Sequence, residues 1–389
     1  MKPKHELSEI VRGYSKTFLQ KYPQSYQRLK TLDAIARCRT ASLGGHQCKC
    51  SSCGTEKYFY NSCRNRHCPK CQAVNRERWI AQREAELLPV PYFHLVFTLP
   101  HELNQLAEQY PKQVYNALFY ASWQTIKSFA GDEKHLGAKT GMVAVLHTWG
   151  QQLWLHPHLH CIVPGGGISK QGKWKWSRNK GKYLFPSYAM AKVFRAKYVA
   201  KLGESGIKIP PEIRRTIFKK EWVVYAKQTF SKPEYVMEYL GRYTHKIAIS
   251  NHRLERVENG EVTFRYKDYK RSGKTFESTM KAEEFLRRFC MHILPKGFMK
   301  MRHYGILASK NKAKELNFAK KQFRQEPWKK VKLKWSEIAI QRLNIKTLKQ
   351  CSKCKKGIME PVGVIHPERG PPMFKLNPNL AFVNQQPNK

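Results

Sequence analysis

The chain has 389 residues, which is enough for two or three domains and a substantial core. Its 72 lysines and arginines outnumber its 28 aspartates and glutamates, so the net charge is +44, spread along the whole chain. Such an imbalance favours a polyanionic partner, because binding releases the counterions condensed on a polyanion. No apolar run is long enough to span a membrane and no long amphipathic basic helix is evident, so we expect nucleic acid rather than a membrane.

The expected elements mix helices with antiparallel strands. Helical periodicity covers residues 6–37, and 72–88 reads as a second helix stopped by prolines. A strand is expected over 92–100, with helical segments from there to Gly131. Further elements follow in chain order: a hairpin around Gly150, helices at 187–203 and 232–243, and a hairpin turning at Asn259-Gly260. These elements predict an α+β fold with antiparallel strands.

Two CxxC pairs stand in the N-terminal quarter of the chain. Cys50/Cys53 and Cys68/Cys71 are separated by fourteen residues. Each pair can form a tight turn that aims two thiolates at one ion, and four thiolates complete a tetrahedral zinc site. The N-terminus lacks the apolar stretch of a signal peptide, so we expect a cytoplasmic chain whose thiols stay reduced. We therefore predict one structural zinc ion, Zn²⁺, held by these four cysteines.

Other metal-binding residues lie close to these pairs or near the C-terminus. Four of them could replace a ligand or form a second site: Cys38, Cys48, Cys63 and His67. The C-terminal pair Cys351 and Cys354 is only half a site. It is either two free thiols in a basic tail or a zinc knuckle, and the sequence favours neither.

Three histidines alternate in the stretch "WLHPHLHCIVPGGG", residues 154–167. On a strand, residues two apart share a face at about 6.6 Å, close enough for two imidazoles to bind one ion. His156 and His160 would be about 13 Å apart, too far for one ion to bind all three. Pro157 lacks an amide hydrogen and suits a strand edge or start, so His158 and His160 are the better pair. The alternative is that the histidines only line a polar cleft.

A basic and aromatic stretch follows the histidines. Its lysines and arginine could contact phosphates while its tryptophans stack on bases of single-stranded DNA. The residues concerned are Lys173, Trp174, Lys175, Trp176, Arg178 and Lys180. The alternative is a twisted surface hairpin that packs its tryptophans on itself.

The histidine–hydrophobic–histidine pattern at 158–160 resembles the HUH single-strand endonucleases, which include relaxases, rolling-circle replication initiators and a class of transposases. The fuller resemblance is to the insertion-sequence ninety-one family of two-tyrosine rolling-circle transposases. Six blocks carry it, in the family's order, from about residue 38 to 310: "NSCRNRHCPKCQ", "FHLVFTLP", "HTWG", "HPHLHCIVPGGG", "YLGRYTHKIAISNHRL" and "HYGILA".

The resemblance implies two nucleophilic tyrosines, four residues apart on a helix that follows the histidine strand. Tyr239 and Tyr243 match the family's "YLGRY" block, whereas Tyr235 has the same spacing but looks incidental. Residues four apart lie on one helix face, so both phenols would point the same way.

The resemblance also implies a catalytic divalent ion, Mg²⁺ or Mn²⁺, on His158 and His160. Related initiators take the third ligand from the strand that precedes the histidine strand. His147 occupies that place here, with His156 and Gln151 as rivals.

The implied function is a DNA transposase that nicks and rejoins single-stranded DNA at element ends through 5′-phosphotyrosine intermediates. The chain would divide into a helical, zinc-binding and DNA-binding domain (1–90), an antiparallel-sheet HUH core (91–305) and a basic C-terminal region with a disordered tail (306–389). Expected partners are single-stranded DNA at element ends and target, and host helicase or replication proteins, in a nucleoid-associated setting. The alternatives are a rolling-circle replication initiator or relaxase with the same chemistry, or a non-catalytic zinc-dependent DNA-binding protein.

Overall fold

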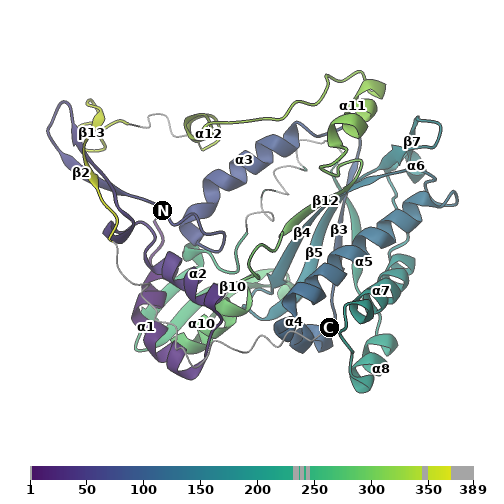
Figure 1. The fold of residues 1–389 in the computed structure, drawn as a ribbon, viewed down its shortest axis with the longest axis horizontal. Helices are drawn as coiled ribbons and strands as arrows, with labels where there is room; N and C mark the ends of the chain where they lie inside the picture. The colour runs from purple at the N-terminus through teal and green to yellow at the C-terminus, as the bar shows by residue number, and fades with distance from the viewer. Residues whose placement is uncertain (1, 231–235, 237–240, 242–245, 344–348, 369–389) are drawn as a thin grey trace.

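The computed structural model describes residues 2–230, 236, 241, 246–343 and 349–368 (Figure 1). Its largest sheet has five strands, and every neighbouring pair is antiparallel. In spatial order they are β12 (Met301–Gly305), β4 (Gly141–Trp149), β5 (Leu155–Pro164), β3 (Tyr92–Thr98) and β8 (Val224–Phe230). The predicted hairpin around Gly150 is the β4–β5 pair, in which His147 lies opposite His158.

The two faces of this sheet have different surroundings because side chains alternate along each strand. One face carries Leu95, Leu159 and Cys161, which pack under α5 (Pro111–Gly131) and α7 (Ser187–Glu204) in the main apolar core. Figure 1 shows these two helices lying against the sheet. The opposite face carries the histidines of β4 and β5, next to a smaller apolar cluster that includes residues of α3 (Gln72–Glu84) and α11 (Lys312–Gln322).

A second layer forms around a three-stranded sheet, β11 (Lys274–Lys281), β10 (Glu261–Asp268) and β9 (Leu254–Glu258). It packs with α10 (Ala282–Met291), α1 (Leu7–Lys21) and α2 (Tyr26–Ala36) in one apolar cluster. The predicted turn at Asn259-Gly260 is confirmed, with positive φ of 50° and 76°, as a two-residue hairpin turn of this kind requires.

A third sheet joins distant parts of the chain: β1 (Gly45–Cys50) lies between β2 (Glu56–Tyr60) and β13 (Met359–Ile365). A short ribbon pairs β6 (Gly166–Ile168) with β7 (Trp174–Trp176). Further α-helices in the described part of the chain are α4 (Asn104–Gln109), α6 (Arg178–Gly181), α8 (Pro211–Lys219) and α12 (Trp335–Gln341). The predicted α+β class with antiparallel sheets is confirmed. In the described residues no helix has the length and apolar character needed to cross a membrane.

Candidate active site and cysteine clusters

Three histidines converge on one face of the large sheet. His147 comes from β4, and His158 and His160 come from β5; one ring nitrogen of each lies within 4.8 Å of the others. The strand register explains the contact, because His147 is paired directly with His158. The register shifts just after His147, and a bulge of this kind changes the direction of a neighbouring side chain. The structure thus brings His147 to the predicted pair.

Hydrogen bonds orient two of the rings. Nδ1 of His158 lies 2.6 Å from the backbone oxygen of His156, so Nδ1 carries the proton and Nε2 is the ring acceptor. Nδ1 of His160 is 2.9 Å from Nε2 of His94, and the two rings are stacked. Metal-binding histidines commonly use their second nitrogen in this way, which fixes the ring for coordination through the other.

Burial keeps these rings neutral, which is the form that binds a metal. Desolvation lowers the pKa of His158 to about 4. Desolvation also lowers the pKa of His160, and the nearby His158, His94, Lys246 and Lys300 add to the effect. The site therefore offers neutral imidazoles at physiological pH without a preceding deprotonation. The donor set fits a divalent ion.

The two rival ligands lie elsewhere. His156 is exposed and is not part of the nitrogen cluster. The side-chain oxygen of Gln151 lies 3.5 Å from the backbone nitrogen of Lys267, on the β10 side of the hairpin. Neither joins the three histidines.

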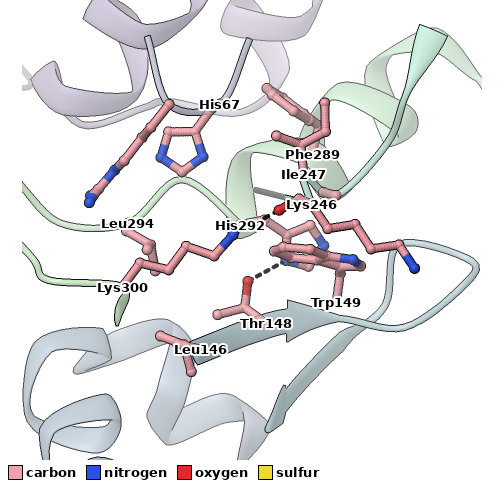
Figure 2. A pocket seen from close by; sticks show the side chains of 12 residues that line it. His67, Leu146, Thr148, Trp149, Lys246, Ile247, Phe289, His292, Leu294 and Lys300 are labelled. Atoms are coloured by element: carbon pink, nitrogen blue, oxygen red, sulfur yellow. Dashed lines mark hydrogen bonds between the residues drawn. The ribbon is translucent and has the colours of Figure 1, made fainter. Parts of the chain in front are cut away.

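A small pocket with basic side chains in its lining lies beside the end of β4 (Figure 2). One of its lining residues, Trp149, stacks on the His147 ring. Lys300 donates to the backbone oxygen of Lys246 at 2.7 Å, and its ammonium lies 5.1 Å from the Trp149 ring centre. Burial, and then the charge of Arg66, lower the pKa of Lys300 to about 7. His67 also lines this pocket, as Figure 2 shows. Arg66, Lys246 and Lys300 thus line one pocket, and the two lysines lie close enough to His160 to lower its pKa.

Both expected nucleophiles, Tyr239 and Tyr243, lie outside the described residues, as does Tyr235. Two neighbours of theirs are described. Val236 is fully buried in the apolar cluster that contains Val143 and Ile162 of the histidine-bearing face. Gly241 is packed so closely that a Cβ there would lie 2.4 Å from Cδ1 of Ile80 in α3.

The predicted DNA-contacting stretch lies beyond the far end of β5. Its two tryptophans contact Phe323, with ring centres 5.3 Å away for Trp174 and 6.0 Å for Trp176. Trp174 is half-buried, whereas Trp176 is 43% exposed. The other members are exposed: Lys173, Lys175, Arg178 and Lys180. Lys175 forms an ion pair with Glu133, and Arg178 donates to the Lys134 carbonyl. Trp174 is therefore more deeply packed against the protein than Trp176, whose ring stays accessible.

Eight of the eleven cysteines form two clusters of four, and the predicted grouping of both CxxC pairs around one zinc is wrong. Cys68 and Cys71 join Cys38 and Cys63, whereas Cys50 and Cys53 join the C-terminal pair. The β1–β2 hairpin is the physical reason. Cys50 ends β1 at the tip of the hairpin, about 17 Å along the strand from Gly45 at its base. Cys38 and Cys63 lie at that base, where Arg39 and Gly44 hydrogen-bond to Asn61. The other two alternative ligands, Cys48 and His67, belong to neither cluster, and His67 lines the pocket of Figure 2 instead.

The cluster at the base of the hairpin fits a structural zinc. Its sulfurs lie within 4.8 Å of one another, with Cys71 at 3.5 Å from Cys38 and 3.6 Å from Cys63. Zn–S bonds of about 2.3 Å in a tetrahedron separate the sulfurs by about 3.8 Å, close to these values. Cys38 and Cys68 are fully buried against α1, α2 and α10. A zinc here would connect the end of α2 to the start of α3.

Sequence reasoning missed His94. It lies on β3 in the same face as His160 and is almost fully buried, with a pKa lowered by burial to about 4. The usable signal was a polar residue in the otherwise apolar strand "YFHLVFTLP", two residues from Tyr92 on that face.

Comparison with known proteins shows that the chain is similar to transposases. A family model described as "Putative transposase" matches residues 141–315, which include the three histidines, and one described as "Transposase zinc-binding domain" matches residues 10–99. "Putative transposase y4qJ" of Sinorhizobium fredii (strain NBRC 101917 / NGR234) is 38% identical over 387 residues, 94% of this chain and 97% of that protein. "Transposase for insertion sequence element IS801" of Pseudomonas savastanoi pv. phaseolicola is 30% identical over 304 residues, 72% of this chain and 70% of that protein. No solved structure gives a significant match.

The sheet, the histidine cluster and these similarities define a DNA transposase with an N-terminal zinc-binding domain. The chain belongs to the insertion-sequence ninety-one (IS91) family of transposases.

Proposed function

We propose that this transposase is an HUH-type single-strand endonuclease and strand transferase, which nicks and rejoins DNA at element ends through tyrosine. The observation that carries the proposal is the convergence of His147, His158 and His160 on one sheet face, with the rings of His158 and His160 held by hydrogen bonds. Mg²⁺ or Mn²⁺ bound there would withdraw charge from the non-bridging oxygens of the scissile phosphate.

The residues of the chain supply the nucleophile. The phenolic oxygen of Tyr239 or Tyr243 attacks phosphorus, and the bond to the 3′ oxygen breaks. The phenol gives up its proton as the new bond forms, and the leaving 3′ oxygen takes up one proton. The products are therefore a 5′-phosphotyrosine ester and a free 3′-hydroxyl. Attack by a 3′-hydroxyl on the ester reverses the step and rejoins DNA without ATP. Two tyrosines allow one to hold the first end while the other cleaves the next junction.

Packing of one described neighbour, Val236, supports this assignment. Val236 belongs to the apolar cluster on the histidine-bearing face. In the helix that the sequence predicts over 232–243, residues 236, 239 and 243 follow i, i+3, i+7 spacing and share one face. Both phenols would then lie on the side of the helix that faces the histidines.

Cationic side chains support binding of a single DNA strand. Lys246 and Lys300 lie close enough to influence His160, and they would attract the phosphate to the site. Trp176, exposed beside four cationic side chains, would stack on a base farther along the strand. The proposal keeps the division into a zinc-binding domain (1–90), a nuclease core (91–305) and a basic C-terminal region (306–389).

The test uses a single-stranded oligonucleotide that carries an end of the element, incubated with Mn²⁺ and separated under denaturing conditions. A 3′ label should shift into a protein–DNA adduct, whereas a 5′ label should appear in a shorter free strand. The Tyr239→Phe/Tyr243→Phe double variant should form no adduct, and Tyr235→Phe, the matched control, should behave like the parent. An adduct in the double variant would refute the nucleophile assignment.

A further inference from the structure

The C-terminal segment pairs with the N-terminal zinc-binding domain. Strand β13 runs antiparallel to β1, with Met359 opposite Cys50. Figure 1 shows β13 and β2 together, away from the five-stranded sheet. Two CxxC pairs separated by about three hundred residues thereby meet: Cys50 and Cys53 from the β1–β2 turn, and Cys351 and Cys354 from the segment before β13.

The four sulfurs of this second cluster have the spacing of a tetrahedral metal site. All lie within 4.8 Å of one another, and the cross-pair distances are 3.7 Å for Cys50–Cys354 and 3.8 Å for Cys53–Cys351. A zinc ion with Zn–S bonds of about 2.3 Å places sulfurs about 3.8 Å apart, whereas a disulfide needs about 2.05 Å. The spacing therefore matches coordination to one ion.

The backbone around the two pairs is built in the same way. Gly54 donates to the Cys50 carbonyl at 3.1 Å, and Lys355 donates to the Cys351 carbonyl at 2.9 Å. Both donors have positive φ, 67° and 57° respectively. Each CxxC pair thus closes a turn that ends in a left-handed residue, and the Gly357 amide points at the Cys354 sulfur from 3.4 Å. Two equivalent turns facing each other are an arrangement typical of zinc ribbons.

Gly357 permits the close approach of the two turns. A Cβ at this position would lie 2.5 Å from the Cys50 sulfur and 2.8 Å from the Ser52 backbone nitrogen. The apolar contacts available are few: the local cluster contains Cys48, Met359 and the site's own cysteines. Apolar burial on this scale is small compared with the entropy of ordering a segment from residue 349 to 368. A bond to a metal would supply the missing stabilisation.

We propose that Cys50, Cys53, Cys351 and Cys354 bind a second structural zinc that fastens the C-terminal segment to the N-terminal domain. Cys351 and Cys354 lie outside both regions matched by the family models, 10–99 and 141–315. The inference does not depend on the phosphotyrosine mechanism, since zinc can be counted without any cleavage.

The test is native mass spectrometry of the full chain, purified under reducing conditions without added metal and scored for bound zinc. The parent should carry two zinc ions, and the Cys351→Ser/Cys354→Ser variant one. Cys48→Ser is the matched control, because Cys48 lies on β1 beside the cluster but is not among its four sulfurs, and it should keep two. One zinc in the parent, or an unchanged count in the double variant, would overturn the proposal.

If the double variant fails to fold, alkylation of the parent protein tests the second zinc site instead. Iodoacetamide should label Cys351 and Cys354 slowly in the native chain and rapidly once a chelator has removed zinc. Equal labelling rates before and after chelation would contradict the second site.

Discussion

The hydrogen bond between His94 and His160 gives the sharpest test of how the catalytic site is held. Both rings are buried, with 5% and 8% of their surface exposed, and the two nitrogens are 2.9 Å apart. His94→Phe keeps a planar ring of similar size and removes the partner of Nδ1. His94 would act as a positioning residue, because it orients a ligand and is not itself in the nitrogen cluster.

The size of the effect follows from this one contact. Loss of a buried hydrogen-bond partner costs about 1–3 kcal/mol. Loss of an outer partner of a metal-binding histidine typically weakens metal affinity or activity about 10–100-fold. We therefore expect the Mn²⁺ concentration for half-maximal cleavage to rise about 10–100-fold, while the rate at saturating Mn²⁺ stays within about threefold of the parent.

The assay is cleavage of a labelled single-stranded element end over a series of Mn²⁺ concentrations. His135→Phe is the control, since its ring contacts Phe129 and Phe185 in the main core, away from the histidine cluster. A purely structural role for His94 would lower the rate at all Mn²⁺ concentrations without changing the half-maximal value. That pattern would refute the positioning role.

Three further outcomes are expected. The His158→Ala/His160→Ala variant should lose about a thousandfold or more in cleavage rate, because a Lewis acid supplies several kcal/mol, yet fluorescence anisotropy should find its affinity for single-stranded DNA nearly unchanged. The pKa of Lys300 is about 7 in the folded chain, below its ordinary value of 10.5. Between about pH 7 and 10.5 the unfolded chain therefore binds more protons than the folded chain. The free energy of unfolding of the parent should rise with pH over this range. Urea unfolding of Lys300→Met should lack this rise, and an equal rise would contradict the burial effect. Trp176→Ala should weaken DNA binding with little change in melting temperature, whereas Trp174→Ala should lower the melting temperature. A larger drop in melting temperature for Trp176→Ala than for Trp174→Ala would contradict the packing described for these rings.

Local sequence patterns were enough to predict that His158 and His160 share one strand face, whereas His147 was expected only from the family resemblance. His158 and His160 lie two apart on a strand, and a short hairpin sets the register that brings His147 opposite His158. Strand periodicity and turn chemistry act over a few residues, so they can be recognised without tertiary information. The same holds for the turn at Asn259-Gly260.

The cysteine grouping could not be predicted in this way. Spacing shows that Cys50 and Cys53 form one turn, but it cannot show which second pair faces that turn. The partner, Cys351 with Cys354, is brought there by the pairing of β13 with β1. Long-range strand pairing leaves no local trace in the sequence, so spacing alone points to the nearer CxxC pair, Cys68 and Cys71, which belongs to the other cluster.

His94 was missed for a related reason. A single histidine in an apolar strand is more often a satisfied core residue than part of a metal site. Its role becomes evident only from the register of β3 against β5, which places it diagonally across from His160.

The central claim is that a tyrosine beside the histidine cluster becomes covalently bound to DNA. The direct measurement is peptide mapping by mass spectrometry of the adduct trapped with an element-end oligonucleotide and Mn²⁺. The account predicts a nucleotide phosphate on Tyr239 or Tyr243, and no adduct when a chelator replaces Mn²⁺. A phosphate on any other residue, or an adduct that forms equally well with the chelator, would contradict it.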